Sequence, residues 1–310
     1  MEKNFIMAFD QGTTGSRVVL FNRDGAIVSS AYREIEQIYP QPGCVEHNPE
    51  EIWQTSIQCA EEVLSQSGVS PLQIAAIGIT NQRETVVLWD KKSGKPLYNA
   101  IVWQCRRTAP QCEQLKGQGL EEEVRERTGL IIDPYFSATK IMWIRDHVAG
   151  VKEKIARKEV CAGNVDAWLI WHLTGGKSHV TDYSNASRTM LFNVKSLRWD
   201  ELLLRETGIP EEILPDAKPS SGEFGYTDER VFFGARIPIM GVAGDQQAAL
   251  FGQASFKPGM AKNTYGTSLV AMMNIGEKFI PSQNRLITDL AWAVDGKVTY
   301  GFEGVVFTGG

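Results

Sequence analysis

The sequence predicts an α/β protein in which helices pack on a mixed β-sheet. Strands open the chain, a long amphipathic helix follows, and a nearly all-apolar strand comes next at 74–80. A strand, a long helix and a buried strand form a crossover unit, so the sheet is mixed and has helices packed on it. Hydrophobic residues make up 43% of the 310 residues, and charged residues make up 22%, so the chain can bury a sizeable core.

The N-terminal strands are expected at 5–9, 16–21 and 26–32. The first helix begins after Asn48, since Asn is a good N-cap and Pro49 fits the first helical position. Gly68 ends this helix. Apolar residues recur along it at helical spacing and predict the face that packs on the sheet: Trp53, Ile57, Ala60 and Leu64.

The middle of the chain alternates further helices with a second buried strand. Helices are expected at 109–116, 137–147, 165–173 and 200–207, and a strand at 237–244 is followed at once by a helix at 246–251. After 260 the pattern changes to an antiparallel meander, with strands at 260–264, 269–274, 286–294 and 297–302, then one more buried strand at 302–307. We therefore predict one domain over 1–253 and the start of a second, cut short, over 254–310.

Composition excludes several classes of protein. A net charge of −5 argues against a nucleic-acid binder that relies on a basic face and against a polybasic membrane-surface protein. No apolar run approaches the roughly 18 residues that would span a bilayer. The five Cys form no CxxC pair, which favours reduced thiols in a cytoplasmic protein over a disulfide framework or a zinc site.

The loop at 10–16, DQGTTGS, is a candidate phosphate-binding loop. Its glycines let the backbone approach a ligand closely, and its hydroxyls and successive backbone N–H groups can hold an anion. Asp10, at the end of the first strand, could hold a phosphate-bound Mg²⁺. A tight hairpin turn explains the same residues without any ligand.

Large polar residues follow both buried strands. Arg83 and Glu84 come just after the strand at 74–80, and Asp245 follows the strand at 237–244. Ligands in α/β sheets bind at such strand ends, although a solvated turn would account for Arg83 and Glu84, and helix capping would account for Asp245. Trp103 is either a core aromatic or the wall of a pocket.

Several segments together resemble the FGGY carbohydrate kinase family of the actin/hexokinase superfamily, in particular its members that phosphorylate glycerol. The resemblance runs in one register from residue 5 to 310. It implies a ribonuclease-H-like, actin-like ATPase fold and ATP-dependent phosphorylation of glycerol to sn-glycerol 3-phosphate in glycerol catabolism. The segments that carry it are AFDQGTT at 8–14, NQRET at 81–85, IVWQCRR at 101–107, YFSATKIMWIRDH at 135–147, GDQQAALFGQ at 244–253 and NTYGT at 263–267.

The resemblance also assigns roles to individual residues, with ATP and Mg²⁺ as cofactors. Asp245 is implied as the catalytic base and Asp10 as the residue nearest Mg²⁺. The residues implied to bind glycerol are Arg83, Glu84, Trp103, Tyr135, Asp245 and Gln246. Those implied to contact ATP or ADP are Thr13, Thr14, Gly15, Ser16 and Arg17, joined by Gly266, Thr267 and Gly310 from the second domain. We expect no nucleic-acid partner, no integral membrane segment and a homo-oligomer in the full-length form.

The chain departs from the resembling enzymes in three places. Residues 268–270 read Ser-Leu-Val where those enzymes usually carry Gly, Cys and Phe, so Val270 should loosen one edge of the pocket. Residues 229–235 lack the glycine-rich loop with which some members bind a sugar bisphosphate, so we do not expect that regulation. The family's enzymes are also longer, and we expect little or no kinase activity from these 310 residues alone.

Two alternatives remain at this point. One is another FGGY sugar or polyol kinase such as a pentulose kinase, against which Arg83, Glu84 and Trp103 count. The other is a non-catalytic, actin-like nucleotide-binding protein, which would have no reason to carry a polyol pocket.

Overall fold

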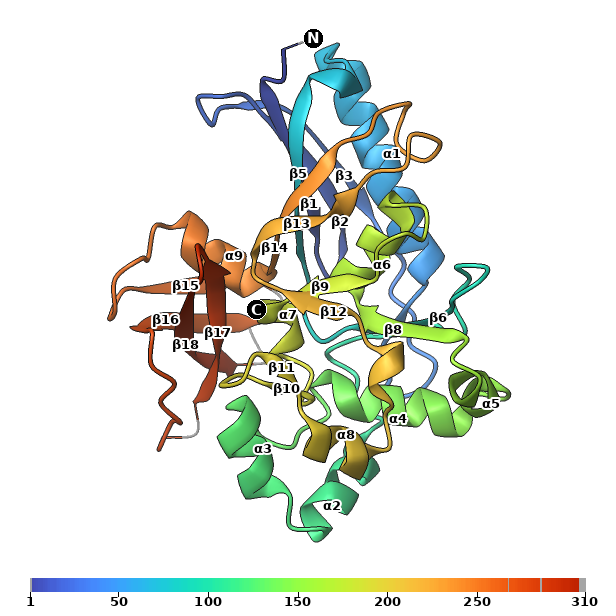
Figure 1. The fold of residues 1–310 in the computed structure, drawn as a ribbon, viewed down its shortest axis with the longest axis vertical. Coiled ribbons are helices and arrows are strands. Elements are labelled where there is room, and N and C mark those ends of the chain that lie inside the picture. Colours follow the sequence, from blue (N-terminus) through green and yellow to red (C-terminus); the bar gives the residue numbers. More distant parts are fainter. Residues whose placement is uncertain (1, 267, 285, 307–310) are drawn as a thin grey trace.

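A six-stranded mixed sheet forms the largest layer of the computed structural model, which describes residues 2–266, 268–284 and 286–306 (Figure 1). Its strand order is β13-β14-β5-β1-β2-β3. β1 pairs in parallel with β5, and β5 with β14, whereas the three outer pairings are antiparallel, so the predicted mixed sheet is confirmed. The strands are β1 (Phe5–Gln11), β2 (Gly15–Phe21), β3 (Ile27–Glu34), β5 (Ile74–Asn81), β13 (Ser221–Tyr226) and β14 (Pro238–Gly244).

Helix α1 (Pro49–Ser67) makes the predicted crossover from β3 to β5. The Asn48 side chain accepts a hydrogen bond from the Glu50 N–H, and Gly68 ends the helix in the left-handed region at φ 66°. The buried face of the helix differs in part from the predicted one. Ala60 and Leu64 are buried, but Trp53 and Ile57 are only half-buried. Trp53 instead stacks on the ring of His172, 5.1 Å between centroids, so it contacts a neighbouring helix at the margin of the core.

That neighbouring helix, α6 (Val165–Leu173), and α1 cover the same face of the sheet. The indole N–H of Trp168 donates to the carbonyl of Pro49 at 2.8 Å, which ties the two helices together. Trp89 packs edge-on against both Trp168 and Trp171. Both Trp168 and Trp171 are therefore part of the core.

A second, four-stranded sheet has the order β4-β7-β6-β8 and was not predicted. Its strands are short and almost entirely buried, so they lack the alternating pattern that marks a half-buried strand. They are β4 (Glu46–His47), β7 (Ala100–Ile101), β6 (Val86–Asp90) and β8 (Val160–Asn164). The helices in this half of the molecule are α2 (Ala109–Gly117), α3 (Glu121–Thr128), α4 (Ser137–His147), α5 (Val151–Ala156) and α8 (Glu201–Thr207).

Shorter elements connect these layers. They are the helices α7 (Tyr183–Ala186), η1 (Pro71–Gln73) and η2 (Glu211–Ile213), and the strand pairs β9 (Val180–Asp182) with β12 (Asp216–Lys218) and β10 (Phe192–Asn193) with β11 (Arg198–Trp199).

A third sheet follows helix α9 (Asp245–Gly252) and stands beside the first (Figure 1). Its strands are β15 (Ala261–Tyr265), β16 (Leu269–Gly276), β17 (Ile287–Val294) and β18 (Lys297–Val306). All pairings are antiparallel, but the order β15-β16-β18-β17 corrects the predicted meander, because β16 pairs with β18 and not with β17. β18 runs unbroken to Val306, so the separate strand expected from 302 is part of it, while residues 307–310 lie outside the described ranges.

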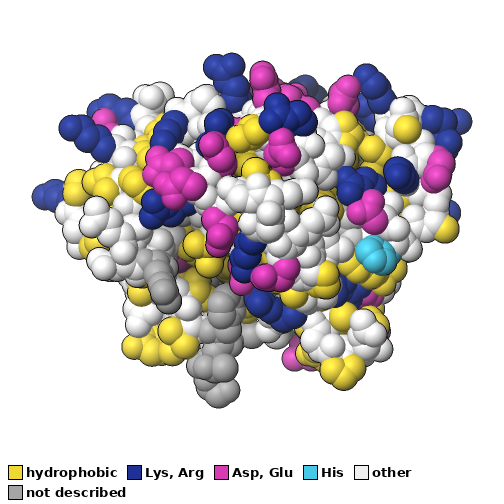
Figure 2. Space-filling view, turned by 90° about the horizontal axis from the view of Figure 1, so that it is seen from below, with side chains coloured by type: hydrophobic (Ala, Val, Ile, Leu, Met, Phe, Trp, Pro, Cys, Tyr) yellow, Lys and Arg dark blue, Asp and Glu magenta, His cyan; other side chains and the backbone are white. Residues whose placement is uncertain are grey.

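The five cysteines are free, buried thiols. Basic and acidic side chains are intermixed over the face seen in Figure 2. Within the described ranges, no helix combines the length and apolar character needed to cross a membrane.

Candidate active site

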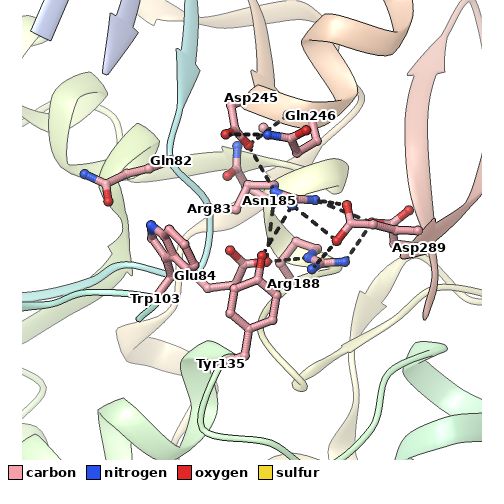
Figure 3. Close-up of polar contacts among 12 residues, drawn as sticks. Gln82, Arg83, Glu84, Trp103, Tyr135, Asn185, Arg188, Asp245, Gln246 and Asp289 are labelled. Atoms are coloured by element: carbon pink, nitrogen blue, oxygen red, sulfur yellow. Dashed lines mark hydrogen bonds and ion pairs between the residues drawn. The ribbon is translucent and has the colours of Figure 1, made fainter. Parts of the chain in front are cut away.

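A pocket of about 170 Å³ opens where β5 and β14 end and the third sheet begins. The volume is below the roughly 300–1,000 Å³ typical of drug-sized ligands, which indicates a small ligand. All six residues predicted to bind substrate line it (Figure 3). Thr13 and Gly266 line it as well. Its walls are Thr13, Gln82, Arg83, Glu84, Trp103, Tyr135, Asp245, Gln246, Thr264, Gly266, Ser268 and Val270.

Arg83 and Glu84 form the buried floor of this pocket. Their exposed fractions are 3% and 1%, so the solvated-turn interpretation is wrong. Glu84 adopts φ 61°, which is uncommon for any residue but glycine, and the Thr85 N–H donates to the Arg83 carbonyl across it at 2.8 Å. Backbone strain of this kind persists where the surroundings enforce it, and it fixes the direction in which the carboxylate points.

Gly244 allows Arg83 to reach the start of α9. A Cβ at position 244 would lie 2.6 Å from the Arg83 Cδ, so only glycine fits beside that side chain. The Arg83 Nε then lies 3.1 Å from the Asp245 carboxylate. Asp245 is the first residue of α9, with Gly244 as its N-cap, so the capping role considered for Asp245 belongs to its neighbour.

Asp245 and Gln246 face the pocket from the start of α9. The Asp245 side chain is 38% exposed, in contrast to the buried Glu84. Its Oδ2 accepts a hydrogen bond from the Gln246 Nε2 at 2.9 Å. Gln246 in turn accepts a bond from Lys262 of β15, whose pKa is lowered to about 8, first of all by burial and then by the charge of Arg83.

Trp103 and Tyr135 supply the apolar side of the pocket. Their rings meet edge to face with centroids 5.9 Å apart. The Trp103 indole N–H donates to the Thr13 hydroxyl at 2.9 Å, so Trp103 is a pocket wall that also touches the first loop. Beneath Tyr135, the buried Lys140 donates to the carbonyls of Tyr135 and Phe136, which fixes the turn that presents the tyrosine.

The first loop lies beside the pocket, between β1 and β2. Gln82 holds it by donating to the Gln11 side chain and the Gly12 carbonyl, and Gln82 also contacts the buried His47, whose pKa burial lowers to about 4. Thr13 reaches the pocket, and the Thr14 hydroxyl lies 3.3 Å from that of Tyr32.

The structure places the other residues predicted to contact the nucleotide in different surroundings. The Ser16 hydroxyl is buried against Thr55, 2.9 Å away in α1, so the structure does not bring it to the loop opening. Gly15 is a packing position, because a Cβ there would lie 2.4 Å from the Arg33 carbonyl. Arg17 stands opposite Asp10 in the β1–β2 register. Gly266 lines the pocket, whereas Thr267 and Gly310 lie outside the described residues.

The Asp245 carboxylate lies close enough to Asp10 to affect the pKa of Asp10. Burial is the main cause that raises the Asp10 pKa, Arg17 opposes this, and the charge of Asp245 raises it further. The ends of β1 and β14 therefore place two carboxylates near one another beside the loop. The described residues contain no cluster of three or more His, Cys, Asp or Glu side chains that could hold a metal ion by themselves.

Three charged residues behind the pocket were missed by the sequence analysis. Arg188 donates to Glu84 at 2.5 Å and to Asp289 at 2.9 Å (Figure 3). It also donates to Glu303 at 2.8 Å. Arg83 also donates to Glu303, at 2.5 Å. We call Arg83, Glu84, Arg188, Asp289 and Glu303 the charged network. Glu303 stands in a strand predicted as buried, and Asp289 stands in another predicted strand. A carboxylate in a buried strand was the available signal, since it must find a partner.

The pKa values of the two strand carboxylates, Asp289 and Glu303, are shifted in opposite directions. Burial and the neighbouring charge of Glu303 raise the pKa of Asp289 to about 7. Burial also acts to raise the pKa of Glu303, but the guanidinium groups of Arg188 and Arg83 outweigh it and lower that pKa to about 2. Burial raises the pKa of Glu84 despite the guanidinium of Arg188.

Comparison with known proteins adds to this geometry. Residues 5–252 match the profile of the N-terminal domain of the FGGY family of carbohydrate kinases. The chain belongs to this family. A glycerol kinase from Thermoanaerobacter pseudethanolicus is 60% identical to it over 306 residues, which cover 99% of the chain and 61% of that relative.

Solved structures of FGGY kinases share the fold. The crystal structure of Plasmodium falciparum glycerol kinase with ADP matches with a TM-score of 0.92 and 37% identity, over 98% of this chain and 61% of the other. A xylulose kinase from Rhodospirillum rubrum matches with a TM-score of 0.87 over 97% of this chain and 60% of the other. At 23% identity the second match shows the fold alone. The chain thus spans about 61% of the length of the curated relatives it matches.

Proposed function

We propose that this chain is the substrate-binding part of a kinase that transfers the γ-phosphoryl group of ATP to glycerol, giving sn-glycerol 3-phosphate. The observation that carries the proposal is the convergence of Arg83, Glu84 and Asp245 on one small pocket beside Thr13. The relatives near 60% identity are named glycerol kinases, which favours glycerol over a pentulose. The xylulose kinase likeness extends only to the fold.

The pocket suits a three-carbon triol. A ligand this small is recognised mainly through its three hydroxyl groups, so the site must offer several donors and acceptors at once. Arg83 can donate, Glu84 and Asp245 can accept, and Gln246 can do both. Trp103 and Tyr135 give the carbon chain an apolar surface.

Asp245 is placed to assist the transfer. Its exposed carboxylate can orient one glycerol hydroxyl, whose oxygen attacks the γ-phosphorus while the bond from that phosphorus to the β-phosphate oxygen breaks and ADP leaves. The hydroxyl proton passes to Asp245. Phosphoryl transfer has a loose transition state, so we expect the base to act late and its positioning role to matter most.

The first loop and Asp10 suit a nucleotide and its metal. Mg²⁺ in such sites is usually held by one or two carboxylates together with substrate phosphates and water, which fits Asp10 better than an all-protein cage would. Bound there, Mg²⁺ would neutralise charge on the phosphates. Thr13 and Thr14, with the backbone N–H groups of the loop, are the residues we propose for the phosphates, and Arg17 lies beside Asp10.

Direct binding tests the substrate. Calorimetric titration of the 310-residue chain should detect glycerol, and neither xylulose nor ribulose should compete with it. Stronger binding of a pentulose than of glycerol would overturn the proposed substrate.

Removing the base tests the role of Asp245. In the full-length protein, Asp245→Asn should lower kcat at least about 10²-fold, because the variant keeps the shape of the side chain but cannot accept the proton. Near-native turnover would refute the role. The 310-residue chain alone should make little or no glycerol 3-phosphate, since such kinases close two domains over the nucleotide and this chain spans about 61% of the length of its relatives.

A further inference from the structure

Every nitrogen of the Arg188 guanidinium group is bonded to a carboxylate. The side chain is fully buried, and its three nitrogens each donate to a different acid: Nε to Glu84, Nη1 to Asp289 and Nη2 to Glu303. Arg188 follows the short helix α7 and does not line the pocket. It is nonetheless the nearer of two guanidinium groups to Glu84, at 2.5 Å against 4.0 Å for Arg83.

Glu303 joins the two arginines. Its Oε2 accepts from the Arg83 Nη1 at 2.5 Å, and its Oε1 accepts from the Arg188 Nη2 at 2.8 Å. Asp289 lies 3.7 Å from Arg83, and its Oδ2 also accepts from the Gln247 Nε2 at 3.1 Å. Carboxylates of β17 and β18 thus hold Arg83 from behind directly, and they hold Glu84 through Arg188.

Fold stability gives no sufficient reason for such a network. Replacing buried ion pairs by apolar residues of similar volume is often neutral or stabilising, so a buried network is weak evidence of a stabilising role. Planar guanidinium groups that bond two or three carboxylates do, however, fix direction as well as distance. In this chain the fixed groups are the two that carry opposite charge into the pocket.

We propose that Arg188 is a positioning residue for substrate binding: it orients Glu84 directly and Arg83 through Glu303, so that glycerol affinity depends on strands β17 and β18. This inference rests on the proposed function. The network crosses from the end of β5 to the third sheet, which means that a shift of that sheet withdraws the carboxylates that orient the pocket floor.

The test compares Arg188→Lys with Arg107→Lys in the 310-residue chain. Arg107 is a matched control, because it forms an equally buried pair with Glu46 at 2.7 Å, with side chains 5% and 2% exposed, and does not line the pocket. Lysine keeps the charge but cannot bond three carboxylates in one plane. We expect Arg188→Lys to raise the Kd for glycerol at least about tenfold, or 1.4 kcal/mol, and Arg107→Lys to change it less than about twofold.

The calorimetric stoichiometry separates positioning from folding. A positioning role raises Kd in a protein that still binds one glycerol per chain, whereas a merely structural role lowers the fraction of competent protein and leaves its Kd unchanged. Unchanged Kd in Arg188→Lys would overturn the proposal. If that variant does not fold, Glu303→Gln, which keeps the side-chain shape and removes one charge, should show the same rise in Kd.

A crystal structure of Arg188→Lys keeps this test independent of the proposed function. We expect the Glu84 carboxylate and the Arg83 guanidinium to change position while the pocket backbone stays in place. A parent chain that binds no glycerol would defeat the proposed function, and the positions of these two groups would then still decide the role of Arg188. Unmoved groups would refute it.

Discussion

Two buried arginine–carboxylate clusters in this molecule differ in their charge balance. In the charged network, two guanidinium groups face three carboxylates, with the half-exposed Asp245 as a fourth at its edge. The Glu46–Arg107 pair is one to one, and its carboxylate also accepts from the Tyr98 hydroxyl and the Asn99 amide, both at 2.8 Å. One cluster borders the pocket and the other does not.

The difference in charge balance indicates a structural role for the Glu46–Arg107 pair and a ligand-binding role for the charged network. Neutral donors complete the solvation of Glu46, so that pair can satisfy a buried carboxylate and tie β4 to the segment around 98–107. The charged network has more acids than bases, burial and the charge of Glu303 raise the pKa of Asp289 to about 7, and a further carboxylate, Asp245, faces the pocket at its edge. Such an arrangement is expected at a binding site more than in a core.

The largest expected difference concerns stability. Arg188→Gln leaves buried carboxylates uncompensated and should lower the free energy of unfolding by about 3–5 kcal/mol. Arg107→Gln should cost less, about 1–3 kcal/mol, because Tyr98 and Asn99 still donate to Glu46. Urea unfolding followed by tryptophan fluorescence measures both values. Equal losses of unfolding free energy in the two variants would contradict the proposed difference between the two clusters.

A smaller effect concerns pH. The folded-state pKa of Asp289, about 7, lies above its unfolded value, so its contribution to stability is present below the unfolded pKa near 4 and is lost as pH rises toward 7. Asp289→Asn should therefore flatten the dependence of unfolding free energy on pH between 5 and 7, compared with the parent chain.

Asp166 is the control for that prediction. Burial raises its pKa to about 7 as well, but its partner is Thr181, and neither residue belongs to the charged network or lines the pocket. Asp166→Asn should flatten the same pH profile and leave the Kd for glycerol unchanged. Glycerol affinity that responds equally to both variants would contradict a local role for Asp289.

The smallest effect is expected at the surface. Glu122 and Arg125 form an exposed pair one turn apart on α3, at 2.9 Å. Exposed pairs of this kind often contribute nothing measurable. Glu122→Gln should leave both the unfolding temperature and glycerol binding unchanged, and a clear shift in either would mean that the comparison depends on total charge and not on burial.

Local signals in the sequence sufficed for much of the fold. Asn48 and Gly68 predicted the ends of α1 because capping depends on residues next to the helix. The short strands β4, β7 and β8 escaped prediction because pairing with distant segments, and not their own pattern, makes them strands.

The same distinction applies to the site. Arg83, Glu84 and Asp245 stand at the ends of predictable buried strands, so their convergence could be expected from the parallel pairing of β5 and β14. Arg188 could not be found in this way, since it follows the short helix α7, which was not predicted, and its bond to Glu303 joins residues 115 positions apart in the chain. The direction of the Ser16 hydroxyl, which faces Thr55, also depends on packing and not on the sequence pattern of the loop.

The most direct test of the central claim is a crystal structure of the 310-residue chain at saturating glycerol. The account predicts one glycerol molecule in the pocket beside Thr13, with its hydroxyl groups within hydrogen-bond distance of Arg83, Glu84 and Asp245 and its carbon chain against Trp103. A pocket that holds only water under these conditions, with Arg83, Glu84 and Asp245 still in place, would contradict it.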